Sequence, residues 1–408
     1  MNMPKRPALA AVPDDDLTRD SSGQRFRSRS YLSVATAIRE NTNDVLEGRQ
    51  LELNEMTGRV ELDRVPLRDG DVSHVRAELE RRIIVNVAKD GERIGLQASK
   101  DDVFSAMNEL AQANVYHPVR EYLSALTWDG VERIKGLIGT AICAQNNNLN
   151  RSLVRRLLIA MVARAMKPGC KLDTVLVLVG LQGIGKSTLF RILASPAFFV
   201  DSPIDIDKKD ALEQLRHAWL IEWAELESLF RARDSTAVKA FLSSCADTYR
   251  PSYGRNVITV PRSCVIVGTT NADEFLTDET GNRRFWPLKV AGVDVVDLAA
   301  QRDQVWAEAF HLFQQGEQWW LTTEEERLLS GSHEQHRVHD AWEERVLSWA
   351  EECAHPFTTT DVLEKAIEKP VGQWGRADEM RVAKILKSAG WTRKTDPDHK
   401  QKGKRWTR

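Results

Sequence analysis

The sequence predicts an α/β protein with a three-layer domain at its centre, an N-terminal accessory domain and a C-terminal winged helix-turn-helix. Three observations predict this fold class. A glycine-rich loop stands between an apolar run and a helix-prone stretch within residues 174–193. Predicted strands and helices then alternate as far as residue 314, which is typical of α/β domains. Three predicted helices and a basic hairpin make up the C-terminal part of the chain.

The glycine-rich loop at residues 180–187 reads Gly-Leu-Gln-Gly-Ile-Gly-Lys-Ser, the P-loop pattern of nucleoside triphosphatases. In this pattern backbone N–H groups turn inward around the phosphates, the lysine reaches the β and γ oxygens, and the serine hydroxyl ligates Mg²⁺. We therefore expect ATP and Mg²⁺ as cofactors. The expected ligands are Gly180, Gly183, Ile184, Gly185, Lys186, Ser187 and Thr188.

The composition is that of a globular protein. The 408 residues are 42% hydrophobic and 28% charged, which suits two or three domains. The N-terminus has no apolar signal segment and no run of residues is long enough to span a bilayer, so we expect a cytoplasmic protein without membrane contact. Because the net charge is only -2, contact with nucleic acid requires local basic patches or a ring of subunits.

The N-terminal third of the chain carries no catalytic pattern. Residues 1–30 contain few large apolar side chains, so we expect a disordered leader. An accessory α+β domain is expected over residues 31–130, with a strand-turn-strand at 51–65. Helices are expected in this domain at residues 73–82 and 100–113. A further, amphipathic helix at residues 150–166 is expected to pack beside the sheet of the ATPase domain.

The ATPase domain is expected over residues 131–325. After the P-loop we expect helices at 209–216, 236–244 and 301–314, strands at 218–224 and 263–269, and a β-rich stretch at 249–260.

The C-terminal region divides into a linker and a small domain. Residues 326–340 are polar and predict a solvated linker, in which His333, His336 and His339 have a spacing that does not favour a shared metal ion. Residues 341–408 predict three helices and a terminal hairpin, the element order of a winged helix. Its basic tip would contact DNA phosphates through Lys402, Lys404 and Arg405, unless the tail is only a solvated charge run.

Two strands of the ATPase domain end in residues suited to hydrolysis. Glu222 interrupts an apolar run, and a buried carboxylate is costly unless a cation lies near it, so we expect Glu222 with Ser187 on the metal side. Glu225 stands at the strand end as the expected base that orients water. Asn271 is expected to position water against the γ-phosphate. The alternatives are solvent-facing glutamates and a turn-forming asparagine.

Basic residues point to a neighbouring subunit and to DNA. Arg283 and Arg284 follow a glycine at 281, and an arginine offered to the next subunit's γ-phosphate would stabilise the transition state, which requires an oligomer. The alternative is a surface ion pair. Arginines and tyrosines interleave at residues 249–256, as a hairpin that binds single-stranded nucleic acid requires, although a structural hairpin also fits. The expected DNA contacts here are Lys239, Arg250, Tyr253 and Arg255.

Seven sequence motifs lie at residues 116–123, 128–130, 180–187, 219–225, 270–271, 280–287 and 306–309. Together they resemble the virulence-associated protein E family, P-loop ATPases of phages and genomic islands that are related to superfamily 3 helicases. The resemblance implies an AAA+/superfamily 3 helicase-like core and a hexameric ring motor that replicates mobile-element DNA. It also implies Arg283 or Arg284 as the trans finger. No primase domain is evident in residues 1–110, so a separate primase or host replication proteins are candidate partners.

Two functions compete, and a third explains less of the chain. The first is an ATP-dependent DNA helicase, a DNA-stimulated ATPase acting on single-stranded or forked DNA. The second is an ATP-regulated initiator or regulator that oligomerises on DNA without unwinding it. A small-molecule kinase would explain the P-loop but would leave the C-terminal domain without a role.

Overall fold

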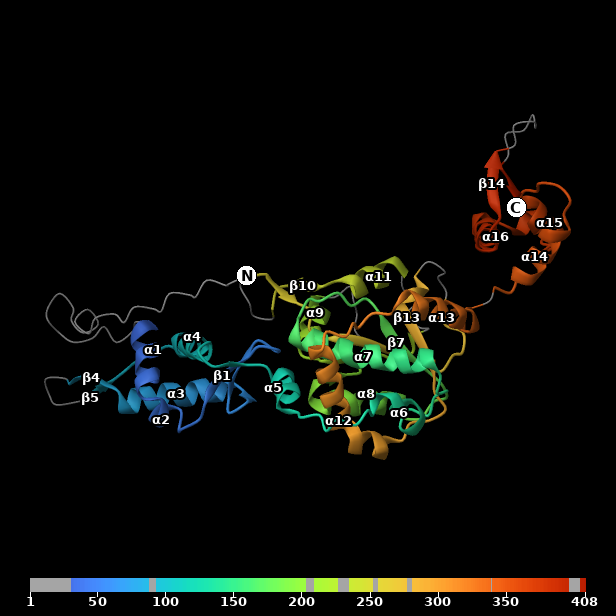
Figure 1. Cartoon of the computed structure of the whole chain (residues 1–408). Coiled ribbons are helices and arrows are strands. Elements are labelled where there is room, and N and C mark those ends of the chain that lie inside the picture. The colour runs from blue at the N-terminus through green and yellow to red at the C-terminus, as the bar shows by residue number, and fades with distance from the viewer. Residues whose placement is uncertain are drawn as a thin grey trace. The chain divides into compact units, whose positions relative to one another are not determined.

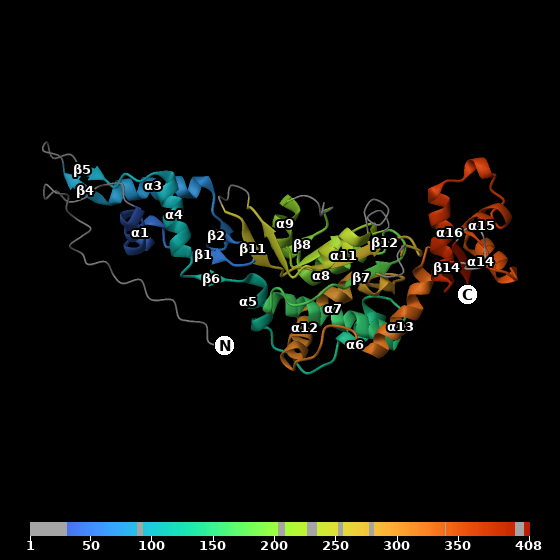
Figure 2. The same ribbon diagram turned by 90° about the horizontal axis from the view of Figure 1, so that it is seen from above.

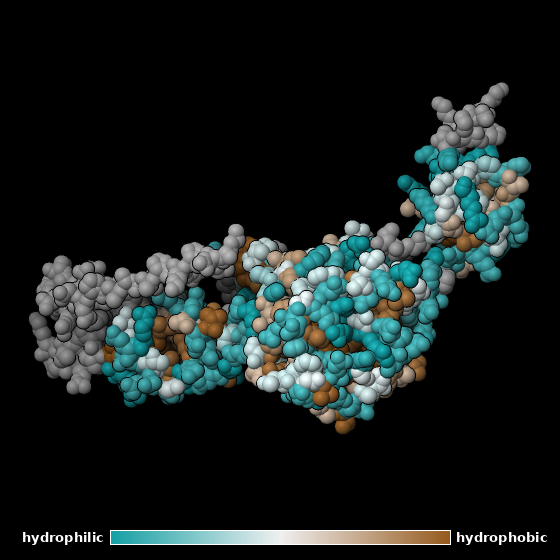
Figure 3. All heavy atoms as spheres, viewed as in Figure 1, coloured by the Kyte–Doolittle hydropathy of each residue, from teal (hydrophilic) through white to brown (hydrophobic). Residues whose placement is uncertain are grey.

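The computed structural model divides the chain into two compact units, Met1–Leu126 and Thr127–Arg408, each of which is described by itself (Figure 1). The leader expected over residues 1–30 lies outside the described residues. On the face seen in Figure 3, hydrophilic residues cover most of the described surface and apolar residues gather only in small patches. The structure describes residues 31–87, 93–202, 209–226, 235–251, 256–276, 281–338, 340–395 and 404–408.

The N-terminal unit combines a small sheet with helices. The sheet has the order β3-β2-β1-β6, and Gly58 at φ 71° allows the tight turn between β1 and β2. Its strands are β1 (Leu51–Asn54), β2 (Arg59–Leu62), β3 (Val65–Pro66) and β6 (Val115–Tyr116), and β4 (Ile84–Val87) pairs with β5 (Arg93–Gly95). The helices are α1 (Tyr31–Glu40), α2 (Thr42–Val45), α3 (Asp69–Arg82), α4 (Lys100–Ala111) and α5 (Pro118–Ala125).

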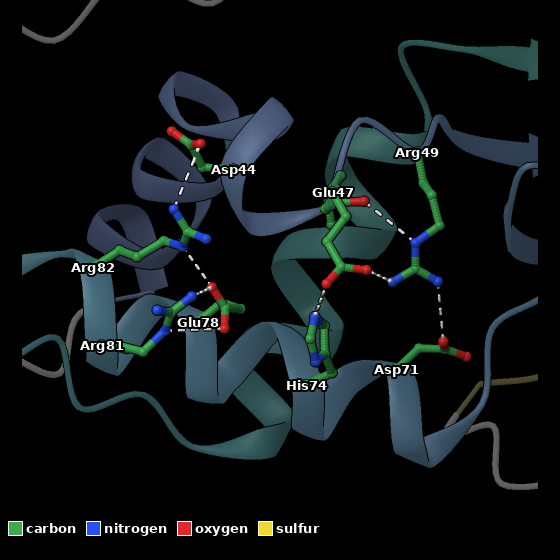
Figure 4. A network of polar contacts seen from close by, with 9 residues as sticks. Asp44, Glu47, Arg49, Asp71, His74, Glu78, Arg81 and Arg82 are labelled. Carbon is green, nitrogen blue, oxygen red and sulfur yellow. Dashed lines mark hydrogen bonds and ion pairs between the residues drawn. The ribbon is translucent and has the colours of Figure 1, made fainter.

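Ion pairs connect α3 to the turn that follows α2 (Figure 4). Arg49 pairs with Asp71 at 3.4 Å, and Glu47 pairs with His74 at 3.2 Å. On the next turns of α3, Arg81 and Arg82 both bond to Glu78 and hold the pKa of its carboxyl near 2. Because at least one partner of most of these pairs is open to solvent, the pairs orient the helix rather than contribute much stability.

A five-stranded parallel sheet forms the centre of the second unit, which confirms the expected α/β class. The strand order is β13-β7-β12-β9-β8, and every neighbouring pair is parallel. All five residues of β7 are buried, as expected for a strand covered on both faces. The strands are β7 (Val175–Val179), β8 (Phe199–Val200), β9 (Leu220–Trp223), β12 (Val265–Thr270) and β13 (Phe285–Lys289).

Helices cover both faces of this sheet. On one face α7 contacts β7, β12 and β13, and α12 packs on α7 and α8, as Figures 1 and 2 show. On the other face α9 and α11 supply Leu215 and Leu242 to a core with Val175 and Val177. The helices are α6 (Ile134–Thr140), α7 (Asn148–Met166), α8 (Lys186–Ala194), α9 (Lys209–Arg216), α11 (Ser235–Ser243) and α12 (Val295–Gln314).

Two tryptophans hold the face of α7 and α12 together. The rings of Trp219 and Trp306 lie 4.5 Å apart between centroids, and both side chains are almost fully buried. Trp219 Nε1 donates to the Met161 carbonyl of α7 at 3.0 Å, and Trp306 Nε1 donates to the Leu193 carbonyl of α8 at 3.0 Å. The indole N–H groups are thereby satisfied inside the core.

The expected solvated linker at residues 326–340 is wrong for its described part. The segment folds as α13 (Thr323–His333) and η3 (Glu334–His336) and packs on the sheet domain. His333 Nε2 lies 2.8 Å from the Phe285 carbonyl, and His336, which is 5% exposed, bonds the Asp273 carbonyl at 2.7 Å. The polar composition suggested a linker, but the imidazoles of both histidines bond backbone carbonyls of the sheet domain and are therefore compatible with a packed segment. His339 lies outside the described residues.

Three helices and a hairpin follow, in the expected order. They share a core with Phe357, Leu363, Leu386 and Trp406, and an isolated bridge pairs Phe357 with Trp406. The elements are α14 (Glu343–Glu352), α15 (Thr359–Lys365), α16 (Arg376–Ser388), β14 (Thr392–Thr395) and β15 (Lys404–Thr407). Across the described ranges, every helix is too short or too polar to cross a membrane.

Replacing Trp306 with alanine should lower the free energy of unfolding by about 3–5 kcal/mol, because it opens a cavity and leaves Trp219 without its ring partner. Urea denaturation followed by circular dichroism measures the change. Leu328→Ala is the control, since this α13 side chain is 46% exposed and its truncation should cost no more than about 0.5 kcal/mol. Equal losses in both variants would contradict the packing described for Trp306.

Candidate nucleotide-binding site and basic edge

Three strands of the sheet end side by side and bring the predicted nucleotide-site residues together. β7 ends at Val179 before the glycine-rich loop, β9 ends shortly before Glu225, and β12 ends at Thr270 before Asn271. Because β7, β12 and β9 are parallel neighbours, all three ends meet at one edge. This is the edge at which open α/β sheets bind ligands.

The glycines of the loop are required for two different reasons. Gly183 and Gly185 have φ values of 82° and 94°, a region that other residues rarely adopt. Gly180 has no room for a side chain, since a Cβ there would stand 2.5 Å from the Val290 carbonyl oxygen and 2.8 Å from Ile184 Cδ1. Gly185 also ends the loop as the N-cap of α8, so the positive end of the helix faces the loop.

Lys186 lies inside the loop and is 8% exposed. Its ammonium group donates to the carbonyl oxygens of Gly180 and Leu181 at 2.7 Å each, and to Asn271 Oδ1 at 2.9 Å. These bonds hold the lysine head group between the ends of β7 and β12. The structure therefore brings Asn271 into the site, although its expected role in positioning water remains a prediction.

Glu222 is the most buried acidic residue of the site, at 1% exposure. Its Oε1 atom accepts hydrogen bonds from Ser187 Oγ at 2.7 Å and from Thr269 Oγ1 at 2.5 Å. Its Oε2 atom is buried and has no hydrogen-bond partner among the described residues. An unsatisfied carboxylate oxygen is costly, and a cation beside Ser187 would satisfy it.

Glu225 is exposed and adopts φ 51° just after β9. A non-glycine residue in the left-handed region is uncommon and tends to occur at functional positions. The side chain lines the same cavity as Lys186 and Asn271. This location agrees with the predicted water-orienting role and does not test it.

The residues around the loop enclose a cavity of about 310 Å³. This donor set fits a triphosphate and a divalent cation: a left-handed glycine loop, a helix N-terminus, a lysine, and a serine hydroxyl beside an unsatisfied buried carboxylate oxygen. The cavity is lined by Gln182, Gly183, Gly185, Lys186, Ser187, Thr188, Ala224, Glu225, Thr269, Thr270 and Asn271.

Arg283 and Arg284 lie at the opposite edge of the sheet. They directly precede β13, whose five residues run parallel to β7 and separate the two edges by roughly 16 Å. Neither arginine lines the cavity around the glycine-rich loop. Arg284 is tied down, with Nε 3.6 Å from Asp173 Oδ2 and a second nitrogen 3.3 Å from Ser243 Oγ, whereas Arg283 is exposed.

The β-rich stretch forms a hairpin at the same opposite edge. β10 (Ala246–Tyr249) pairs antiparallel with β11 (Ile258–Pro261). At its base Arg262 Nε donates to Asp247 Oδ2 at 2.9 Å, and both side chains are buried. Tyr249 is 4% exposed, so it cannot stack on a base as its pattern suggested. Arg250 is exposed, and Tyr253 and Arg255 lie outside the described residues.

The other predicted DNA contacts have mixed surroundings. Lys239 on α11 lies against Gly281, where an added Cβ would stand 2.0 Å from its Cε atom. In the C-terminal hairpin Lys404 is exposed, and Arg405 donates to the Pro356 carbonyl at 3.1 Å. Lys402 lies outside the described residues.

Sequence reasoning missed three supporting residues. Thr269 bonds Glu222 from the neighbouring strand, and Asp173 and Ser243 hold Arg284. Thr269 had a usable signal, because a hydroxyl near the end of a buried strand beside Glu222 needs a polar partner. Asp173 and Ser243 had no such signal in the sequence, since their contacts with Arg284 depend on which strand pairs with β7.

Comparison with known proteins places the chain in a family. A model of the virulence-associated protein E-like domain matches residues 123–338, more than half of the chain. The chain belongs to the virulence-associated protein E-like family. This finding confirms the resemblance read from the sequence, and the matched range contains the glycine-rich loop, Glu222, Asn271 and both arginines. No curated protein sequence matches the chain.

Solved structures of the NrS-1 C-terminal region are similar to this virulence-associated protein E-like chain. Two apo structures in the A form have 10% and 9% sequence identity and TM-scores of 0.47 and 0.45. A further apo structure has 10% identity and a TM-score of 0.43. The matches cover 92% of this chain and 98–99% of those chains.

Gly180→Ala should disrupt the loop, because the new Cβ meets a backbone oxygen that cannot move alone. We expect a loss of stability of about 1–3 kcal/mol. Differential scanning calorimetry measures this. The control is Gly70→Ala in α3, where the Cβ meets open space and the change should be neutral or stabilising by at most about 1 kcal/mol. Matching effects would refute the close approach at Gly180.

Proposed function

We propose that this protein is a DNA-stimulated ATPase that works as a replicative helicase of a phage or genomic island. The observation that carries this proposal is one edge of the sheet. There Lys186, Ser187, Glu225 and Asn271 line one cavity, and the buried Glu222 bonds Ser187. Family membership supports it, because the family model covers this whole edge.

The roles of the residues follow from their positions. ATP with Mg²⁺ supplies the phosphoryl group and the charge that its transfer requires. Lys186 would bind the phosphates, and Ser187 with the open oxygen of Glu222 would hold the cation. Glu225 would accept a proton from the attacking water, which Asn271 would orient. The backbone N–H groups of Gly183 and Gly185 would bind the phosphate oxygens.

Arg283 would complete the site of a neighbouring subunit. It lies one strand length away from the cavity of its own chain, a distance that its side chain cannot span. Arg284 is held by Asp173 and Ser243 and fixes the turn that presents Arg283. A site built from residues of two subunits requires an oligomer, and the family resemblance favours a hexameric ring.

DNA would be bound through the β10–β11 hairpin and a C-terminal winged helix. Residues 341–368 carry seven acidic and two basic side chains, net -5, whereas residues 369–408 carry twelve basic and four acidic ones, net +8. The positive half includes α16 and the hairpin, the two elements that a winged helix applies to DNA. This charge separation favours a DNA-binding role over a solvated tail.

Lys186→Ala and Arg283→Ala should each lower the rate of ATP hydrolysis at least about 100-fold. The first variant loses the ligand of the phosphates, and the second loses the positive charge offered to the neighbouring subunit. An equal mixture should regain part of the activity, since a subunit with an intact loop can meet a subunit with an intact arginine. Coupled-enzyme ATPase assays at several protein concentrations measure this. Arg284→Ala is the comparison and should chiefly lower the melting temperature. Failure of the mixture to recover activity would contradict a trans arginine.

The regulator remains the second candidate, because the charge separation of the C-terminal domain suits duplex binding equally well. A strand-displacement assay on forked DNA distinguishes the two. A helicase should release the labelled strand only with ATP, and the Lys186→Ala variant should release none. A regulator should bind the fork and ATP without displacing the strand, and that result would overturn the proposed helicase.

A further inference from the structure

Two adjacent tryptophans stand at the surface beyond the end of α12. Trp320 is 55% exposed, and its ring meets the half-buried Trp319 edge-on, with 5.1 Å between centroids. The ring of Phe313 follows at 6.4 Å from Trp319. Large aromatic side chains contribute most when they are covered, so an indole held in water indicates a surface that another molecule covers.

The backbone around the two tryptophans is anchored on both sides. Glu317 bonds Arg155 and Arg156, and Arg156 also donates to the Gln318 carbonyl at 2.7 Å. Trp319 Nε1 donates to the Lys171 carbonyl at 3.0 Å. The next residue, Leu321, is 7% exposed. Trp320 is thus presented by a fixed segment, which lowers the entropy lost when a ligand binds.

Lysines flank these rings. Lys167 Nζ lies 5.1 Å from the centroid of the Phe313 ring, and both Lys167 and Lys171 are exposed. Glu317 bonds two arginines, and the single carboxylate of Asp173 is shared by Arg284 at 3.6 Å and Lys171 at 3.5 Å, so it offsets only one of these two cations. The surface therefore offers aromatic faces together with positive charge.

The loop that carries these lysines also packs at the base of the β10–β11 hairpin. Gly169 N donates to the Arg262 carbonyl at 2.8 Å, and a Cβ on Gly169 would stand 3.2 Å from the Cys245 carbonyl oxygen. Gly169 has φ 79°, so a glycine is needed for this close approach. The aromatic surface and the hairpin are consequently parts of one edge of the sheet domain.

We propose that Phe313, Trp319 and Trp320, with Lys167 and Lys171, form a binding platform for single-stranded DNA. Bases stack on exposed indoles whatever their sequence, and lysines neutralise the phosphates between them. A protein partner fits less well, because lysine is depleted in the cores of protein interfaces. The platform takes its ligand class from the proposed function but depends on no step of ATP hydrolysis.

Trp320→Ala should weaken binding of a fluorescein-labelled oligodeoxythymidine about 5- to 100-fold, while Trp320→Phe keeps most of the affinity. Lys167→Met should reduce the slope of the logarithm of the binding constant against the logarithm of the salt concentration by the amount expected for the loss of about one phosphate contact. Fluorescence anisotropy measures both, with Leu328→Ala as the control for loss of an exposed apolar side chain. All variants should keep the wild-type melting temperature and DNA-free ATPase rate.

The outcomes separate this platform from the proposed motor. Loss of DNA affinity in Trp320→Ala but not in Lys186→Ala supports the platform even if no unwinding is found. Wild-type affinity in Trp320→Ala overturns it. A change in oligomer size by sedimentation velocity, with affinity per subunit unchanged, also overturns it, because the tryptophans would then cover a contact between copies of the chain.

Discussion

The structure of the candidate site depends on the parallel pairing of β12 with β7 and β9. This pairing brings the ends of three strands to one edge, so that residues up to 91 positions apart in the sequence, Gly180 and Asn271, come into contact through Lys186. The same pairing sets Thr269 beside Glu222. If β12 slipped by one residue, its side chains would change faces and Glu222 would lose its buried hydroxyl partner.

Parallel pairing also explains why Arg283 and Arg284 lie far from the cavity. A strand that enters a parallel sheet begins at the edge opposite to the one where its neighbours end. Arg283 and Arg284 precede β13, and the hairpin precedes β12, so both are placed at the starting edge. The sheet thereby separates two groups of residues: the proposed phosphate ligands stand at one edge, and exposed basic and aromatic groups stand at the other.

Much of this arrangement could be predicted from the sequence, and the failures have physical reasons. The helix expected at residues 209–216 is observed as α9, and the loop glycines adopt the conformations that their pattern requires. Patterns of this kind are local. The burial of Tyr249 and the hydrogen bond of His336 depend on residues that are distant in the sequence. The type of a residue alone does not reveal which backbone carbonyl it will bond or which core it will join.

One helix joins the two edges. Near the start of α12, Val293 and Val295 pack against Gly185 of the loop, and the helix then runs roughly 30 Å to the segment that carries Trp319. Trp306 anchors its middle to α8 and to Trp219. Packing contacts therefore run without a break from the loop that carries Lys186, through Trp306, to the segment that carries Trp319.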